Sequence, residues 1–187
     1  RVTDIMMKLN EKYNLKTTLF FSVINADRLG PFPSWMGNQA LGQTLEDETI
    51  RVLDSILSRY ENIDYVIFAG DIDYHFQRAS GSIPTYIEFF DDVYSEIKSN
   101  HPDVQIGNSM SLENVLNKGM EPGGSFELTP KLEMGDFIAL SYKPIDTIGD
   151  INRTPQEAID NLKQSIEIFP SHQLAFFEIS WSTSDFV

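Results

Sequence analysis

Two acidic residues stand where buried strands of this sequence are expected to end. Asp71 follows the apolar run 65–69, and Glu178 directly follows Leu-Ala-Phe-Phe at 174–177. A charge after such a run is costly to bury without a purpose, which favours a function for Glu178 over a place on a solvated rim. For Asp71, an ordinary role at the start of a turn is equally compatible with the pattern. Two carboxyl groups from separate strands can serve as the acid and the nucleophile that cleave a glycosidic bond.

Further polar and aromatic side chains lie near the expected strand ends. Hydroxyl, amide and aromatic groups suit a carbohydrate, because aromatic rings pack against sugar faces. Trp35 lies in a Pro-rich loop, where a sugar platform and a plug that anchors the loop are equally compatible. Asp73 has an alternative role as a hydrogen-bond acceptor for loop amides. The predicted substrate-binding residues are Asn25, Trp35, Asp73, His75, Asn108, Tyr142 and Trp181.

A metal site is a weaker hypothesis for the same region. Asp71, Asp73 and His75 would share one face if the strand continued through them, and two carboxylates with an imidazole can bind a divalent ion. Three ligands from one strand rarely converge without help from elsewhere. We therefore expect neither a metal nor a cofactor, and we keep a metal-dependent hydrolase as a second alternative function.

The elements that must position these residues alternate regularly along the chain. Apolar residues spaced by three and four predict helices, and short apolar runs predict strands between them. Strict alternation is typical of a parallel sheet with helical crossovers. An open doubly wound sheet remains an alternative, although no Gly-rich phosphate motif follows a strand. Helices are predicted near 2–9, 50–60, 84–100 and 155–169, strands at 17–24, 65–69, 104–109, 136–142 and 174–179, and loops at 28–42 and 117–131.

The length of the chain limits how much of a barrel it can form. A complete eightfold barrel takes about 250 residues, and this chain has 187. We therefore expect residues 1–187 to be a single (β/α) barrel domain that supplies about five of the eight units, as part of a longer chain.

Three strand ends together resemble the clan A glycoside hydrolases, in particular their β-galactanase-like branch. Residues 65–74 are similar to the fourth strand of that family, residues 136–144 to the sixth, and residues 176–181 to the seventh. The resemblance implies an α/β fold, a (β/α)8 TIM barrel represented by strands 3 to 7. It also implies a retaining mechanism with Glu178 as nucleophile and Asp71 as general acid. In that family pattern Tyr142 would donate a hydrogen bond to Glu178, and Trp181 would stack on a sugar.

Three positions depart from the family pattern. Asp71 replaces a glutamate and so has a shorter side chain, Gly70 replaces an asparagine, and Lys143 replaces a tyrosine. A retracted carboxyl is a handicap for a general acid, which must come within about 3 Å of its proton acceptor. The resemblance still predicts a glycoside hydrolase acting on a β-linked oligo- or polysaccharide. The main alternative is a non-catalytic carbohydrate-binding or scaffold barrel that has lost its acid.

Composition narrows the possible partners. The chain has 28 acidic and 14 basic residues, a net charge of −14, and no cysteine. Such a charge disfavours nucleic acid, and the absence of cysteine excludes disulfides and thiolate sites. No apolar run is long enough to span a membrane. Acidic surfaces keep secreted proteins soluble, and we expect a secreted, periplasmic or cell-surface protein. The sequence indicates neither the sugar and linkage nor the oligomeric state.

Overall fold

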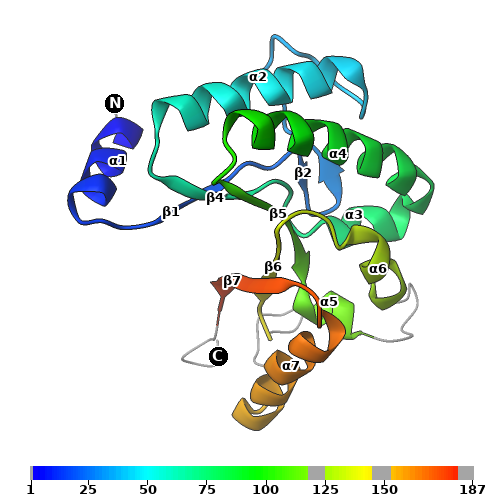
Figure 1. Ribbon diagram of the computed structural model, residues 1–187. Helices are drawn as coiled ribbons and strands as arrows, with labels where there is room; N and C mark the ends of the chain where they lie inside the picture. Colours follow the sequence, from blue (N-terminus) through cyan, green and yellow to red (C-terminus); the bar gives the residue numbers. More distant parts are fainter. Residues whose placement is uncertain (1, 118–124, 145–152, 181–187) are drawn as a thin grey trace.

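Five parallel strands form one sheet in the computed structural model, which describes residues 2–117, 125–144 and 153–180 (Figure 1). Their order in the sheet is the order in which they occur along the chain, and each neighbouring pair is parallel. The predicted parallel sheet is therefore confirmed. The strands are β1 (Thr17–Phe20), β4 (Ile63–Ile67), β5 (Gln105–Ser111), β6 (Phe137–Tyr142) and β7 (Gln173–Ile179).

Four long helices lie where apolar spacing predicts them. In α4, the buried residues Tyr86, Phe90, Val93 and Ile97 recur at helical intervals and face the sheet. Thr154 begins the last helix with a capping box, in which its hydroxyl accepts from the backbone of Glu157. The long helices are α1 (Val2–Lys12), α2 (Gln43–Arg59), α4 (Ile83–Asn100) and α7 (Pro155–Ile168).

Several short elements differ from the sequence prediction. The strand expected at 17–24 ends at Phe20. Ile24, the last residue of the expected strand, belongs to a separate hairpin of two short strands. Short helices also occur between the predicted elements and in the loop predicted at 117–131, because one or two turns carry too few residues to show a period. These elements are β2 (Ile24–Asn25), β3 (Arg28–Leu29), α3 (Ile72–Arg78), α5 (Leu112–Leu116), α6 (Thr129–Leu132) and the 3-10 turns Ser80–Ser82 and Phe126–Leu128.

The sheet is strongly curled. Its edge strands β1 and β7 would lie about 19 Å apart in a flat five-stranded sheet, at about 4.8 Å per strand. Instead, Phe20 of β1 stacks on Phe177 of β7 with ring centroids 5.6 Å apart. The two edges are thus bent toward each other, and the sheet is an open half barrel.

Apolar side chains fill both faces of this half barrel. Outward-facing residues of the central strands, among them Val66, Ile106 and Leu140, join the main core beneath the helices. Inward-facing residues form a smaller cluster around Ile67, Phe137 and Ala139. In a barrel the crossover helices cover the outer face, and side chains of the strands themselves pack on the inner face.

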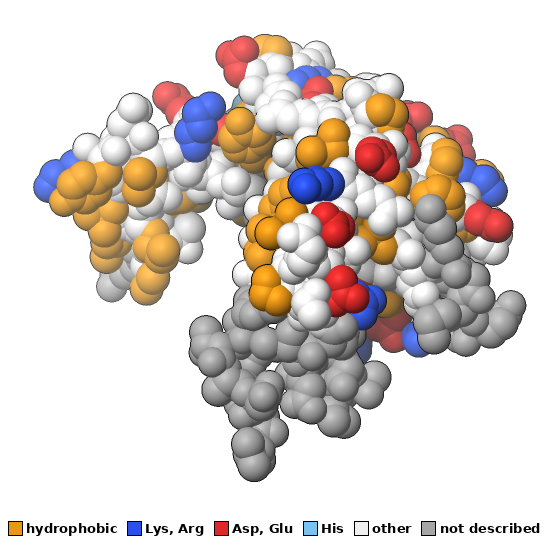
Figure 2. Space-filling model, turned by 90° about the horizontal axis from the view of Figure 1, so that it is seen from below, with side chains coloured by type: hydrophobic (Ala, Val, Ile, Leu, Met, Phe, Trp, Pro, Cys, Tyr) orange, Lys and Arg blue, Asp and Glu red, His pale blue; other side chains and the backbone are white. Residues whose placement is uncertain are grey.

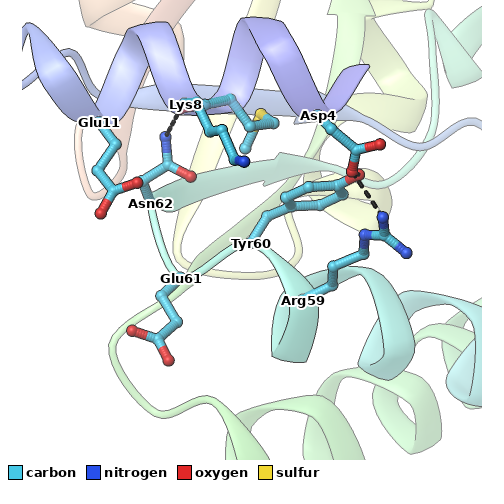
Figure 3. Close-up of a pocket in the computed structure, with 8 residues that line it drawn as sticks. Asp4, Lys8, Glu11, Arg59, Tyr60, Glu61 and Asn62 are labelled. Carbon is cyan, nitrogen blue, oxygen red and sulfur yellow. Dashed lines mark hydrogen bonds and ion pairs between the residues drawn. The ribbon is translucent and has the colours of Figure 1, made fainter. Parts of the chain in front are cut away.

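The first helix is attached to the rest of the molecule by a polar seam. Tyr60 donates a hydrogen bond to Asp4 Oδ1 at 2.8 Å, and Arg59 Nη2 pairs with the same oxygen at 2.6 Å (Figure 3). Asn62 donates to the carbonyl of Met7 at 3.3 Å. A groove of about 430 Å³ lies along this seam, near the start of β4 and therefore at the end of the sheet opposite Asp71.

The opposite face of α1 is apolar and exposed. Val2, Ile5, Met6 and Leu9 recur at helical spacing and are each about half exposed or more. Hydrophobic side chains gather on the lobe that α1 forms at the left of the molecule (Figure 2). Among the described residues, no helix is both long and apolar enough to cross a lipid bilayer.

Candidate active site at the carboxyl edge of the sheet

The turn after β4 presents Asp71 at the carboxyl edge of the sheet. Asp71 adopts φ 45° and ψ 49° immediately before α3. Aspartate tolerates this left-handed region better than most side chains do. Its backbone N–H donates to Ser109 Oγ of β5 at 2.7 Å, so the turn is anchored to the neighbouring strand.

Two hydroxyl groups also hold the carboxyl group of Asp71. Ser141 Oγ of β6 donates to Oδ1 at 2.9 Å, and Ser109 Oγ donates to the same oxygen at 3.3 Å. Burial raises the pKa of Asp71, the two hydroxyls and the Lys143 ammonium oppose that rise, and the Glu178 carboxylate adds to it. A carboxyl whose pKa is raised keeps its proton to a higher pH, as a general acid requires.

Glu178 reaches the same region through an irregularity in β7. Leu140 pairs with Phe176, but Ser141 pairs with Glu178, so β7 contains one additional residue at this point. A bulge of this kind changes the direction of the following side chain. Glu178 thus stands opposite Ser141, the residue that binds Asp71. Lys143 Nζ lies 2.8 Å from Glu178 Oε1, and both side chains are nearly half exposed.

The structure explains the glycine before Asp71. A Cβ atom at Gly70 would lie 2.6 Å from the ring of Phe20. That ring stacks on Phe177, the residue before Glu178. An asparagine at position 70 would therefore require Phe20 to move, and the apolar ring occupies space beside the candidate carboxyl groups.

The predicted hydrogen bond from Tyr142 to Glu178 is wrong. Tyr142 is buried, and its hydroxyl accepts a hydrogen bond from Asn161 of α7 at 3.0 Å. Side chains alternate along a strand, so Tyr142 faces the helices while Ser141 faces the interior. The other predicted aromatic residue at this rim, Trp181, lies outside the described residues.

Asp73 was predicted to bind substrate, but its position does not allow this. Its alternative role, as an acceptor of structural hydrogen bonds, accounts for its surroundings. It is fully buried in the first turn of α3. Its oxygens accept hydrogen bonds from the backbone of Ser111 at 3.0 Å, from Asn114 Nδ2 at 2.5 Å and from Ser125 Oγ at 3.0 Å. Burial raises its pKa to about 6 against these donors. Asp73 joins α3, β5 and the segment before α6, and no oxygen remains accessible to a sugar.

Asn108 was also predicted to bind substrate, and it points away from the rim. Its side chain is fully buried beneath α4, where Oδ1 accepts a hydrogen bond from Tyr86 at 2.7 Å. Ser109, the next residue, carries the polar contact to Asp71 instead. The prediction selected the right strand end but the wrong face.

The remaining predicted residues lie around the rim without contacting Asp71 or Glu178 in any described interaction. Asn25 is exposed beside Gly70, to which it is bridged. His75 Nδ1 lies 3.3 Å from the carbonyl oxygen of Asp27. Trp35 is 65% exposed and borders an apolar pocket of about 210 Å³, which is also lined by Phe32 and Leu45. These three residues stay predicted sugar contacts.

The metal hypothesis fails on geometry. Residues 72–78 form a helix rather than a continued strand, so Asp71, Asp73 and His75 do not share one face. The carboxyl oxygens of Asp73 already accept hydrogen bonds from three donors. No group of three or more acidic or histidine side chains suited to a metal occurs within residues 2–117, 125–144 and 153–180.

Sequence reasoning missed several groups near this edge. Ser109 and Ser141 carry no motif of their own, and only their alternation with buried neighbours could have indicated that they face inward. Glu113 lies two residues after β5, and burial raises its pKa to about 7, with the charge of Arg153 opposing the rise. The signal available in the sequence was an acidic residue shortly after a predicted strand.

Comparisons with known proteins give a likeness in structure alone. No protein-family model and no curated protein matches the chain. A β-glucuronidase of Bacteroides uniformis matches with a TM-score of 0.67 and 14% identity, over 97% of this chain and 20% of the other. A structure of B. uniformis β-glucuronidase 2, covalently bound to cyclophellitol-6-carboxylate aziridine, matches with a TM-score of 0.67 and 12% identity. That match covers 97% of this chain and 20% of the other. A psychrophilic glycoside hydrolase family 10 endo-β-1,4-xylanase matches with a TM-score of 0.59 and 13% identity, over 98% of this chain and 61% of the other.

These matches agree on the architecture. The chain spans about a fifth of the glucuronidases and 61% of the xylanase. At such low identity the likeness shows the fold and does not transfer an activity. The chain has the fold of part of a (β/α)8 TIM barrel, of the kind found in glycoside hydrolases.

Proposed function

We propose that this domain is a retaining glycoside hydrolase that acts on a β-linked oligo- or polysaccharide, with Glu178 as nucleophile and Asp71 as general acid. One observation carries the proposal. Ser141 binds the carboxyl of Asp71 and stands opposite Glu178 in the β6–β7 ladder, which supports a site at one edge of the sheet for two residues far apart in sequence. The assignment to the β-galactanase-like branch, a carbohydrate partner and a secreted or cell-surface location belong to the same proposal.

The reaction would proceed in two displacements. A Glu178 oxygen attacks the anomeric carbon, the bond from that carbon to the leaving oxygen breaks, and Asp71 gives its proton to the leaving oxygen. Water then attacks the anomeric carbon of the glycosyl ester. Asp71 takes a proton from that water, and the Glu178 carboxylate is released. The raised pKa of Asp71, caused mainly by burial, supports its role as the acid.

A non-catalytic carbohydrate-binding barrel is the second candidate, and two contacts favour it. Lys143 forms a 2.8 Å ion pair with Glu178, which a sugar would have to displace or accommodate. The ring of Phe20 covers the position of Gly70 beside the acid. Either contact could leave a domain that binds sugars without cleaving them.

Activated aryl β-glycosides separate the two functions, because a good leaving group needs little help from an acid. We expect Glu178→Gln to lower turnover of such substrates by at least 1,000-fold, on the order of the loss of a nucleophile. Asp71→Asn should lower it much less, and it should affect natural substrates more strongly. Glu167→Gln on α7 is a surface control that should match the wild type. Wild-type protein that binds sugars without turning over any aryl glycoside would establish the second function and exclude the first.

A further inference from the structure

The two serines that hold Asp71 act on the same oxygen of its carboxyl group. Ser109 and Ser141 both donate to Oδ1, at 3.3 and 2.9 Å. No described residue donates a hydrogen bond to Oδ2. The carboxyl rotation is therefore set by β5 and β6 together, and Oδ2 is the oxygen left to carry a transferable proton.

The two serines differ in what else they do. Ser109 Oγ also accepts the backbone N–H of Asp71 at 2.7 Å, so it supports the left-handed turn itself. The bond from Ser141 goes to the side chain of Asp71. Loss of the Ser141 hydroxyl would consequently disturb the orientation of the carboxyl and leave the turn anchored.

Ser141 is connected to both proposed catalytic residues, by a side-chain hydrogen bond to Asp71 and by strand pairing with Glu178. It pairs with Glu178 across the β6–β7 ladder, and Lys143, the first residue after β6, forms the ion pair with Glu178. Ser141 and Lys143 alternate with the outward-facing Tyr142, which places both on the interior side. The end of β6 thus contacts Asp71 with one side chain and Glu178 with the other.

We infer that Ser141 is a positioning residue that fixes Oδ1 of Asp71 and so directs Oδ2 toward the leaving oxygen of the substrate. This role rests on the proposed hydrolase function. The hydrogen bond itself is a property of the folded chain and can be tested without activity.

Several charged and titratable groups around Asp71 also influence its pKa, and a titration must distinguish their effects from that of Ser141. The ammonium of Lys143, just after β6, lowers the pKa of Asp71, and the carboxylate of Glu178 on β7 raises it. Asp73 and Tyr74 on α3 also interact electrostatically with Asp71. None of these groups is altered by a substitution at position 141.

The test compares Ser141→Ala with Ser141→Thr by NMR titration of carbon-13-labelled aspartate, with Asp71→Asn identifying the Asp71 signal. Because the Ser141 hydroxyl lowers the pKa of Asp71, we expect Ser141→Ala to shift that pKa upward. Ser141→Thr keeps the hydroxyl and should restore the wild-type value. Ser95→Ala, on the exposed surface of α4, is the matched control and should leave the titration unchanged.

Kinetics on a substrate with a poor leaving group give a second readout. Ser141→Ala should lower kcat roughly tenfold or more with little change in KM, and it should move the basic limb of the pH profile upward. If Ser141→Ala does not fold, Ser141→Cys replaces it, since a thiol of similar shape is only a weak donor.

The outcomes separate this inference from the proposed function. An Asp71 titration that is unchanged in Ser141→Ala or Ser141→Cys would overturn the positioning role, whatever the activity. An upward shift in protein without glycosidase activity would retain the hydrogen-bond role of Ser141 and reject the hydrolase.

Discussion

At the scale of single residues, the carboxyl edge of the sheet separates two aspartates that are only two positions apart. Asp71 lies at the rim between two serines, whereas Asp73 is buried among three donors. Their difference follows from the start of α3, because the first helical turn rotates alternate residues to different sides. Asp71 is therefore open to chemistry, and Asp73 serves the architecture.

Asp73 makes folding stability depend on pH. Its pKa in the folded chain is raised to about 6 from 3.8, so its neutral form is favoured in the folded state. The stability it contributes is fully present below about pH 3.8 and is lost as pH rises through about 6, on the order of 2–3 kcal/mol. Chemical denaturation from pH 4 to 7 should show this loss in the wild type relative to Asp73→Asn. Parallel stability profiles for the two proteins would contradict the assignment.

The side chain of Asp71 is one methylene shorter than a glutamate, and this length affects how far the proposed general acid can reach. Asp71→Glu adds the methylene of the glutamate found in the clan A pattern that the sequence resembles, but it pushes the carboxyl past the two serines that now hold it. If retraction of the acid limits turnover, Asp71→Glu should increase kcat on substrates with poor leaving groups by roughly tenfold or more. It should change turnover of activated aryl glycosides little, which serves as the internal control. A loss of activity on both substrates would show that the serine contacts matter more than reach.

At the scale of secondary-structure elements, helix α1 depends on polar contacts for its attachment. Tyr60 and Arg59, at the end of α2, both bind Asp4, and most of the apolar residues of α1 face solvent (Figures 2 and 3). Tyr60→Phe should accelerate backbone hydrogen exchange in α1 by roughly two- to fivefold and leave α4 unchanged, because a lost hydrogen bond weakens docking by a modest amount. Tyr13→Phe, which alters an exposed tyrosine just after α1, is the control. Equal exchange in both variants would show that the Asp4 contacts do not hold the helix.

At the scale of the whole molecule, one aromatic contact links the two edges of the sheet. Phe20 and Phe177 come from the first and last strands and stack with centroids 5.6 Å apart. We expect Phe177→Ala to lower the free energy of unfolding by about 1–2 kcal/mol more than Phe176→Ala, its neighbour on β7, because Phe177 belongs to an aromatic pair inside the curl. Urea denaturation of both variants measures the difference. Equal losses would mean that the curl is maintained by the backbone ladder alone.

The sequence by itself determined the alternation of strands and helices, the long helices and the strand ends at which polar groups gather. These features follow from local periodicity and from the cost of burying charge, which any stretch of chain displays on its own. Asp71 and Glu178 could be selected in this way, since each follows an apolar run.

Only the tertiary structure decided which face each rim residue occupies and which residues meet. Asn108 and Tyr142 turn toward the helices, Ser109 and Ser141 turn inward, and a bulge in β7 brings Glu178 opposite Ser141. Strand register changes facing with every single residue, so an error of one position in a strand boundary reverses the prediction. The contact between Phe20 and Phe177 depends on the curl of all five strands, which is a property of the assembled sheet and of no segment alone.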